Sequence, residues 1–183
     1  MIICSIPFTP SVADLITAIA TAITSLTVYF AYKQWKRAEY DSKAQFLKAL
    51  VKEFYNGEVV KFTLKLDYED WKYDGDFHDS ADEHLVDNAL AFASYVCYLY
   101  LKKRINADEF KFFMYDIGRL LEDDGVVDYL YNVYHFSASC KSDFPFHWLY
   151  VYAQQIGAIK AEEFENPNEW RKNDKFNQNL DWE

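Results

Sequence analysis

The sequence is poor in the residues that build phosphate-binding and catalytic loops. It has only five glycines and four prolines in 183 residues. So few glycines leave little material for a loop that holds a phosphate through its backbone N–H groups. No Walker, Rossmann or nucleophile-elbow motif is present. The four histidines, His78, His84, His135 and His147, lack the spacing of metal ligands. We therefore expect no enzyme, no metal site and no other cofactor.

Cysteine is also scarce. Cys4, Cys97 and Cys140 form no closely spaced pair, and an odd number of cysteines suits a reducing compartment. Cys97 lies in an apolar run and is expected to be a small core residue.

Basic residues are missing from the first 32 positions. The rest of the chain holds all 19 lysines and arginines and 28 of the 29 acidic residues, which gives that part a net charge of −9. Contacts with phosphates need clustered cations, so such an acidic chain is a poor candidate for binding DNA or RNA along its length. We expect no long nucleic acid as a partner.

What the first part of the chain does have is one long apolar run. Residues 11–32 carry a single charge, Asp14, and contain no glycine or proline. As a helix they would cover roughly 33 Å, which is enough for a hydrocarbon core of about 30 Å. We therefore predict a transmembrane helix over residues 11–32, with the lipid bilayer as a partner.

Three other structures compete with a membrane span for this segment. A cleaved signal peptide needs a basic start, which residues 1–10 lack. A helix buried in a soluble core would also be apolar, and the threonines make this run only moderately hydrophobic. A helix lying on the membrane surface should carry basic residues on one face, and this run has none.

The flanks of the span predict its orientation. Lys33, Lys36 and Arg37 follow it directly. The positive-inside rule places that side in the cytoplasm. We expect a single-pass protein of the inner (cell) membrane, with the N-terminus outside and the C-terminal domain in the cytoplasm.

Small residues share one face of the span. They recur at steps of three and four residues: Ala13, Thr17, Ala20, Thr24 and Thr27. Small residues let helices approach closely in lipid, which favours self-association and a homo-oligomer. The alternatives are that alanine and threonine simply fill a tolerant helix, and that each threonine bonds the preceding turn of its own helix.

The remaining pattern is helical, so the predicted fold is all-α, with the N-terminal transmembrane helix continuing into a cytosolic helical bundle. The expected parts are a short external N-terminus (1–10), the span (11–32), a helical stalk (33–57), a helical domain (58–164) and a polar tail (165–183). One continuous helix is expected from about 11 to 55. Further helices are expected at 58–73, 81–103, 107–122, 126–136 and 145–158. Capping-box patterns begin two of them, at Ser80 and Asn106.

An acidic loop is expected at residues 74–79. Asp74, Asp76 and His78 faintly resemble a calcium loop, but the required glycine and glutamate are missing. A solvated turn is the favoured interpretation.

One polar cluster is the candidate ligand site. It comprises Asn132, His135, Ser137, Ser139 and Lys141. Asn132 and His135 are one turn apart on a tyrosine-rich helix and can share a face. Aromatic planes beside hydrogen-bonding groups and a cation can hold an unpaired base and a phosphate. The alternative is a capped helix end with a core histidine.

Arg104 and Arg119 are added to this candidate site as sources of positive charge. In a symmetric oligomer, one such residue from each subunit would converge on the axis.

Five further segments are FAYKQWKRAEY (30–40), LVKEFYNGEV (50–59), LDYEDWKYD (66–74), VCYLYLKKRINADEFKFF (96–113) and YLYNVYHF (129–136). These segments resemble those of small single-span bacterial and prophage membrane proteins with a cytosolic helical domain of the DUF4760 type. The plan is also similar to that of membrane effectors of type III CRISPR antiphage systems, which sense cyclic oligoadenylate. This resemblance implies a short span joined to a cytosolic sensing domain.

The leading functional hypothesis follows from the span and the resemblance. It is a membrane-anchored antiphage effector whose cytosolic helical domain binds a nucleotide second messenger, such as cyclic oligoadenylate, and acts at the membrane through oligomerisation. The alternative is a membrane-tethered adaptor that docks another protein and has no small ligand.

Overall fold

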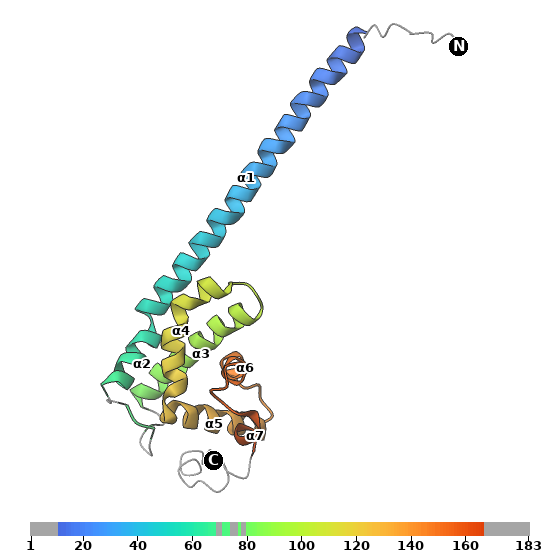
Figure 1. Cartoon of the computed structure of the whole chain (residues 1–183). Helices are drawn as coiled ribbons and strands as arrows, with labels where there is room; N and C mark the ends of the chain where they lie inside the picture. The colour runs from blue at the N-terminus through green and yellow to red at the C-terminus, as the bar shows by residue number, and fades with distance from the viewer. Residues whose placement is uncertain (1–10, 69–70, 74–76, 78–79, 167–183) are drawn as a thin grey trace. The chain divides into compact units, whose positions relative to one another are not determined.

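The computed structural model describes residues 11–68, 71–73, 77 and 80–166. Within these ranges the chain is all-helical, as predicted, and has no β-strand (Figure 1). The helices are α1 (Val12–Asn56), α2 (Glu58–Asp67), α3 (Ala81–Leu101), α4 (Ala107–Glu122), α5 (Asp124–Ser139), α6 (His147–Gln155) and α7 (Ala161–Phe164). The predicted external N-terminus, most of the acidic loop and the tail beyond residue 166 lie outside the described residues.

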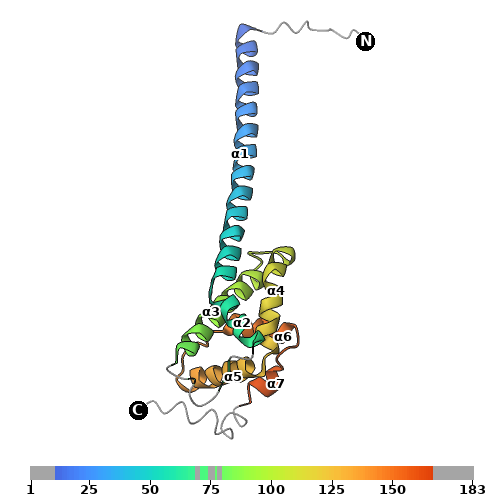
Figure 2. The same ribbon diagram turned by 90° about the vertical axis from the view of Figure 1, so that its left-hand side faces the viewer.

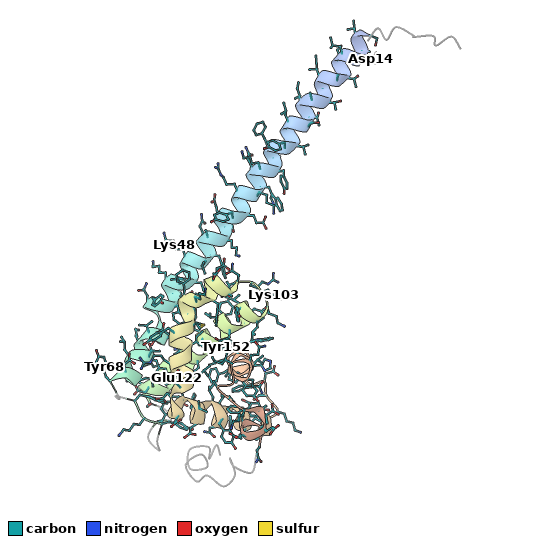
Figure 3. The ribbon with its side chains drawn as sticks, in the orientation of Figure 1. Asp14, Lys48, Tyr68, Lys103, Glu122 and Tyr152 are labelled. Atoms are coloured by element: carbon teal, nitrogen blue, oxygen red, sulfur yellow. The ribbon has the colours of Figure 1, made fainter. Side chains whose placement is uncertain are left out.

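The chain divides into two compact units, Met1–Lys48 and Ala49–Glu183. In the first unit, α1 carries side chains that point outward around the whole helix, from Asp14 to Lys48 (Figure 3). The large apolar side chains of residues 12–35 are more than half exposed, and they include Leu15, Ile16, Ile23 and Phe30. This helix is long and apolar enough to cross a membrane once.

The hydroxyl groups of the apolar segment are bonded within α1 itself. Thr17, Thr24 and Thr27 donate to the carbonyl oxygens four residues earlier, at 2.8 to 2.9 Å. Thr21 and Ser25 do the same. This local bonding is the alternative to hydroxyl contacts between helices, and it leaves the small-residue face free of unsatisfied hydroxyl donors.

In the second unit, α3 is the central helix and packs against α2, α4 and α6 (Figures 1 and 2). Its sequence explains this position, because Val86, Leu90, Ala93 and Cys97 follow helical spacing and are fully buried. The prediction that Cys97 is a core residue is confirmed, and burial raises the pKa of its thiol well above the usual range.

Aromatic rings fill the core of the second unit. Phe54, at the end of α1, meets Phe113 of α4 at a ring distance of 4.9 Å, and Phe62 of α2 meets Trp71 at 5.1 Å. The three phenylalanines are fully buried. Burying each such ring stabilises the fold by about 1.5–3 kcal/mol relative to leaving it exposed.

Both predicted helix starts are confirmed. The Ser80 hydroxyl accepts a bond from the backbone N–H of Glu83, at 3.2 Å. Asn106 and Glu109 form the full reciprocal capping box, with bonds of 2.9 and 2.7 Å. These caps fix the first turns of α3 and α4.

The predicted helix 58–73 is too long. The α2 helix ends at Asp67, and Tyr68, which follows it, is exposed. Trp71 and Tyr73 are buried outside any helix, because their rings pack against distant aromatic residues, Phe62 and Tyr129 among them.

The predicted bounds of the helix 126–136 are too short at both ends. The α5 helix begins at Asp124, because the Asp123 carboxylate accepts a bond from the Val126 N–H at 3.0 Å and caps it. It continues through Ser139, so Ser137 and Ser139 lie within the helix and not beyond its end. The helix predicted at 145–158 is shorter in the structure, where it is α6 (His147–Gln155). The short helix α7 was not predicted.

Candidate ligand-binding site

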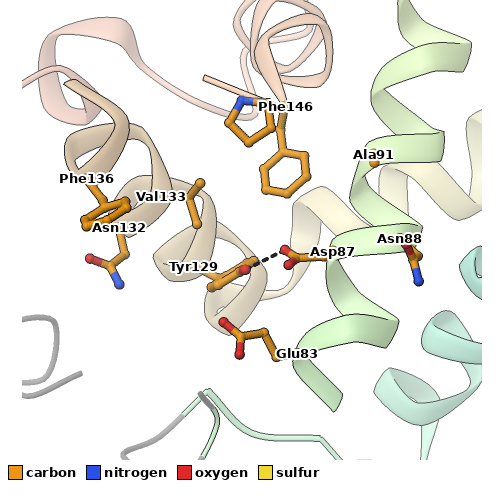
Figure 4. A pocket seen from close by; sticks show the side chains of 10 residues that line it. Glu83, Asp87, Asn88, Ala91, Tyr129, Asn132, Val133, Phe136 and Phe146 are labelled. Carbon is orange, nitrogen blue, oxygen red and sulfur yellow. Dashed lines mark hydrogen bonds between the residues drawn. The ribbon is translucent and has the colours of Figure 1, made fainter. Parts of the chain in front are cut away.

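A groove of about 380 Å³ lies between α3 and α5 in the second unit (Figure 4). The two helices and the segment before α6 supply its walls. The lining residues are Glu83, Asp87, Asn88 and Ala91 of α3, Tyr129, Asn132, Val133 and Phe136 of α5, and Pro145 and Phe146. Its volume is at the lower end of the range of about 300–1,000 Å³ that small-molecule sites occupy.

Two hydrogen bonds hold the polar groups of the groove in place. The Tyr129 hydroxyl donates to the Asp87 carboxylate at 2.5 Å, across the groove from α5 to α3 (Figure 4). The Asn132 amide donates to the Tyr73 hydroxyl at 2.6 Å. The partners are separated by 42 positions in the first bond and by 59 positions in the second. Both bonds therefore depend on the tertiary fold.

Burial and nearby acidic residues raise the pKa of both phenols in and beside the groove. Burial raises the pKa of Tyr73 to about 12, and the charges of Asp128 and Glu83 add to the effect, while the bond with Asn132 opposes it. The pKa of Tyr129 is raised further, first by burial and then by the bond with Asp87 and the charges of Asp87 and Glu83. Both phenols therefore stay protonated and uncharged at neutral pH.

The charged groups among the described lining residues are the carboxylates of Glu83 and Asp87. They lie four residues apart on α3, so they occupy the same helix face. Among the described residues, no lysine or arginine lines the groove, and the aromatic rings of Phe136 and Phe146 lie beside the carboxylates. In the part of the chain that the structure describes, no group of three or more potential metal ligands is close enough to hold an ion.

The structure places the residues of the predicted polar cluster at separate positions. Asn132 is 1% exposed and lines the groove. His135 is also buried, but its Nε2 atom lies 2.8 Å from the carbonyl oxygen of Phe164 in α7. Burial lowers the pKa of His135, and the bond with Phe164 partly opposes that shift. Asn132 and His135 therefore contact different partners, Tyr73 and Phe164, and do not form one site.

The three remaining cluster residues lie at the end of α5. Ser137 is buried, and its carbonyl oxygen accepts the backbone N–H of Ser142 at 2.9 Å. Ser139 is exposed and donates its hydroxyl to the Phe136 carbonyl of its own helix at 2.7 Å. Lys141 is exposed and has a positive φ of 56°. None of these three lines the groove.

The two predicted arginines belong to other surfaces. Arg119 of α4 forms an ion pair with Asp67 of α2, and its guanidinium lies 5.9 Å from the ring centre of Tyr115. Arg104 is exposed in the connection between α3 and α4, next to Lys102 and Lys103. Neither arginine lines the groove.

Sequence reasoning missed most of the groove residues. Glu83 and Asp87 carried a usable signal, because two acids four residues apart in a predicted helix share a face. Tyr129 and Phe146 carried none, since aromatic residues at helical spacing are ordinarily core residues.

Comparisons of the chain with protein-family models, curated proteins and solved structures found no match. The resemblance to single-span DUF4760-type proteins and to antiphage effectors therefore stays a prediction.

Proposed function

We propose that this chain is a single-pass membrane receptor, with a cytoplasmic helical domain that binds a ligand and passes the signal to its span. The observation that carries the proposal is the exposure of the apolar part of α1. Exposed side chains such as Ile19 and Leu26 gain about 1.5–3 kcal/mol each when they leave water, and a bilayer supplies that environment.

The internal bonding of the threonines supports the same proposal. A hydroxyl in hydrocarbon costs free energy unless it is hydrogen-bonded. The hydroxyls of Thr17, Thr21, Thr24, Ser25 and Thr27 all donate to carbonyl oxygens of α1. The segment can therefore enter lipid without unsatisfied donors, and its small-residue face supports association of spans within an oligomer.

The orientation rests on the basic residues after the span, Lys33, Lys36 and Arg37. The natural cysteines provide the test. A membrane-impermeant maleimide applied to intact spheroplasts should label Cys4, whereas Cys140, which is exposed in the folded unit, should react only after lysis. Cys4→Ser and Cys140→Ser variants identify each signal. Labelling of Cys140 in intact spheroplasts would reverse the proposed orientation.

The specific form of the proposal is a sensor of cyclic oligoadenylate in antiphage defence, as the resemblance implies. A nucleotide needs cations near its phosphates. Lys102, Lys103 and Arg104 are three consecutive exposed cations, and Lys102 lies 4.5 Å from the ring centre of Trp148. Calorimetry of the full-length protein with a panel of cyclic oligoadenylates tests this form. Absence of heat at micromolar protein would exclude it.

A second candidate function is a membrane-tethered adaptor. The observation that favours it is the exposure of three large side chains on α4: Phe112, Met114 and Tyr115. Such side chains can mark a protein-binding surface. A photo-crosslinker placed at position 115 should capture one defined protein partner if the adaptor function is correct. A crosslink between two copies of this chain, or none, would count against it.

A further inference from the structure

The basic residues directly after the apolar segment lie on one side of α1. Lys33 and Arg37 are four residues apart, and Tyr29 precedes Lys33 by the same step. At 3.6 residues per turn, these three side chains form one stripe along the helix. Lys36 lies beside the stripe, and its ammonium is 3.3 Å from the Glu39 carboxylate. Lys33 and Arg37 are therefore the core of a cationic surface.

The stripe is open to its surroundings. The Tyr29 side chain is 58% exposed, and Lys33 and Arg37 are exposed as well. The next acidic residues along the chain, Glu39 and Asp41, lie roughly 80° or more around the helix from the line of the stripe. An anion that approaches this side of α1 is therefore attracted by the cations first.

The position of the cations along α1 matches the headgroup layer of a bilayer. That layer is about 5–7.5 Å thick on each side of the hydrocarbon core. With the proposed span ending at Tyr32, Lys33 lies about 1.5 Å and Arg37 about 7.5 Å beyond it along the helix. Glu39 lies about 10 Å beyond the span, outside this layer. The charged side chains of α1 at headgroup depth are thus all basic.

The opposite side of α1 carries small residues. Thr17, Ala20 and Thr24 lie roughly 140–200° around the helix from Lys33. Spans that associate through this small face leave Lys33 and Arg37 directed at lipid, because the two faces point in opposite directions. The neighbour of the stripe is then a phospholipid headgroup. Arginine can bond two phosphate oxygens at once, and lysine supplies a compact positive charge.

We propose that Tyr29, Lys33 and Arg37 bind the headgroup of an anionic phospholipid in the cytoplasmic leaflet. The two cations hold the phosphate, and the Tyr29 hydroxyl donates a hydrogen bond to it from the edge of the hydrocarbon core. This inference rests on the membrane span of the proposed function and names the class of lipid that the span selects. Each cation near an anionic membrane surface favours binding by roughly five-fold.

Spin-labelled lipids measure this preference with the full-length protein. The protein is reconstituted into phosphatidylcholine vesicles that contain a trace of spin-labelled phosphatidylglycerol or, in parallel, of spin-labelled phosphatidylcholine. Electron paramagnetic resonance separates lipid held at the protein surface from free bilayer lipid. At physiological salt we expect phosphatidylglycerol to associate at least about two-fold more strongly, because the other lipid positions around the span dilute the effect of one site. The preference should shrink at higher salt.

Paired variants locate the site. Lys33→Gln/Arg37→Gln removes two charges and should abolish the preference, whereas Lys33→Arg/Arg37→Lys keeps both charges and should retain most of it. Lys48→Gln/Lys52→Gln is the matched control, because it removes two exposed charges at the same spacing on α1. Lys48 lies about 22 Å beyond Lys33 along the helix, more than two Debye lengths away. Melting temperatures show that each variant is folded. Equal losses of preference in the two glutamine variants would overturn the assignment.

The outcomes separate this inference from the membrane span. If both labelled lipids show a surface-held component of equal size, the span stands and the lipid selectivity is wrong. If neither lipid shows one, the chain is not in the bilayer and both proposals are wrong. Excess inorganic phosphate at constant ionic strength should leave the preference unchanged. If phosphate abolishes it, the cations bind a soluble anion and the lipid assignment is wrong. A preference lost only in Lys33→Gln/Arg37→Gln supports both proposals.

Discussion

The hydrogen bond between Tyr129 and Asp87 should be measurable as stability. Tyr129→Phe removes the hydroxyl donor and keeps the ring, which is 3% exposed and packed against Tyr73 and Phe77, so no large cavity forms. A hydrogen bond to a charged acceptor contributes about 1.5–3 kcal/mol. Asp87 is half-buried, so water can partly replace the phenol. We therefore expect a loss of about 1.5 kcal/mol, at the lower end of that range.

Thermal unfolding of the full-length protein in micelles tests this value. Near-ultraviolet circular dichroism reports the packed rings of the second unit, and a loss of this size should lower Tm by about 4–8 °C. Tyr68→Phe is the control, because the Tyr68 ring is 73% exposed and should tolerate the loss of its hydroxyl. Equal Tm values for the two variants would refute the reasoning.

The same variant has an expected pH dependence. The folded pKa of Tyr129 is raised by burial and by Asp87, so its contribution to stability is fully present below the unfolded pKa of about 10. Above that pH the unfolded chain loses the proton while the folded chain keeps it, and the contribution is lost. The Tm difference between wild type and Tyr129→Phe should therefore shrink between pH 9 and pH 11. A difference that grows over this range would contradict the account.

Two further variants test the packing. Gly125→Ala should destabilise by about 1–3 kcal/mol in urea unfolding, because a Cβ atom there would lie 2.8 Å from the Trp71 ring. Gly118→Ala, which meets nothing within 4 Å, should instead stabilise by about 0.5–1 kcal/mol. The buried His135 has a lowered pKa, so wild type should lose stability relative to His135→Gln as pH falls below about 6.5. Parallel Tm profiles from pH 7.5 to 5 would contradict this, as would a neutral Gly125→Ala.

The sequence predicted helix boundaries well where residues close in sequence determine them. The caps at Ser80 and Asn106 depend on side chains three residues away, which the sequence displays directly. The end of α2 was missed because the aromatic spacing continues to Tyr73. The Tyr73 ring is buried by Phe77 and Tyr129, which a periodic pattern cannot reveal.

The candidate site was harder to predict for the same reason. Asn132 and His135 share a helix, yet their partners are Tyr73 and Phe164, which are distant in sequence. The groove forms only when α3 and α5 pack beside each other. The sequence displays the residues of each helix, but it does not show which helices are neighbours in the fold.

Membrane extraction tests the central claim most directly, namely that the apolar segment 11–32 crosses a bilayer. Membranes from cells expressing the full-length chain are washed with alkaline carbonate and sedimented at high speed. Because some 20 apolar residues in lipid hold a protein against such washing, the chain should remain in the pellet and dissolve only in detergent. Release of the chain into the supernatant without detergent would contradict the membrane span, and the proposed receptor function with it.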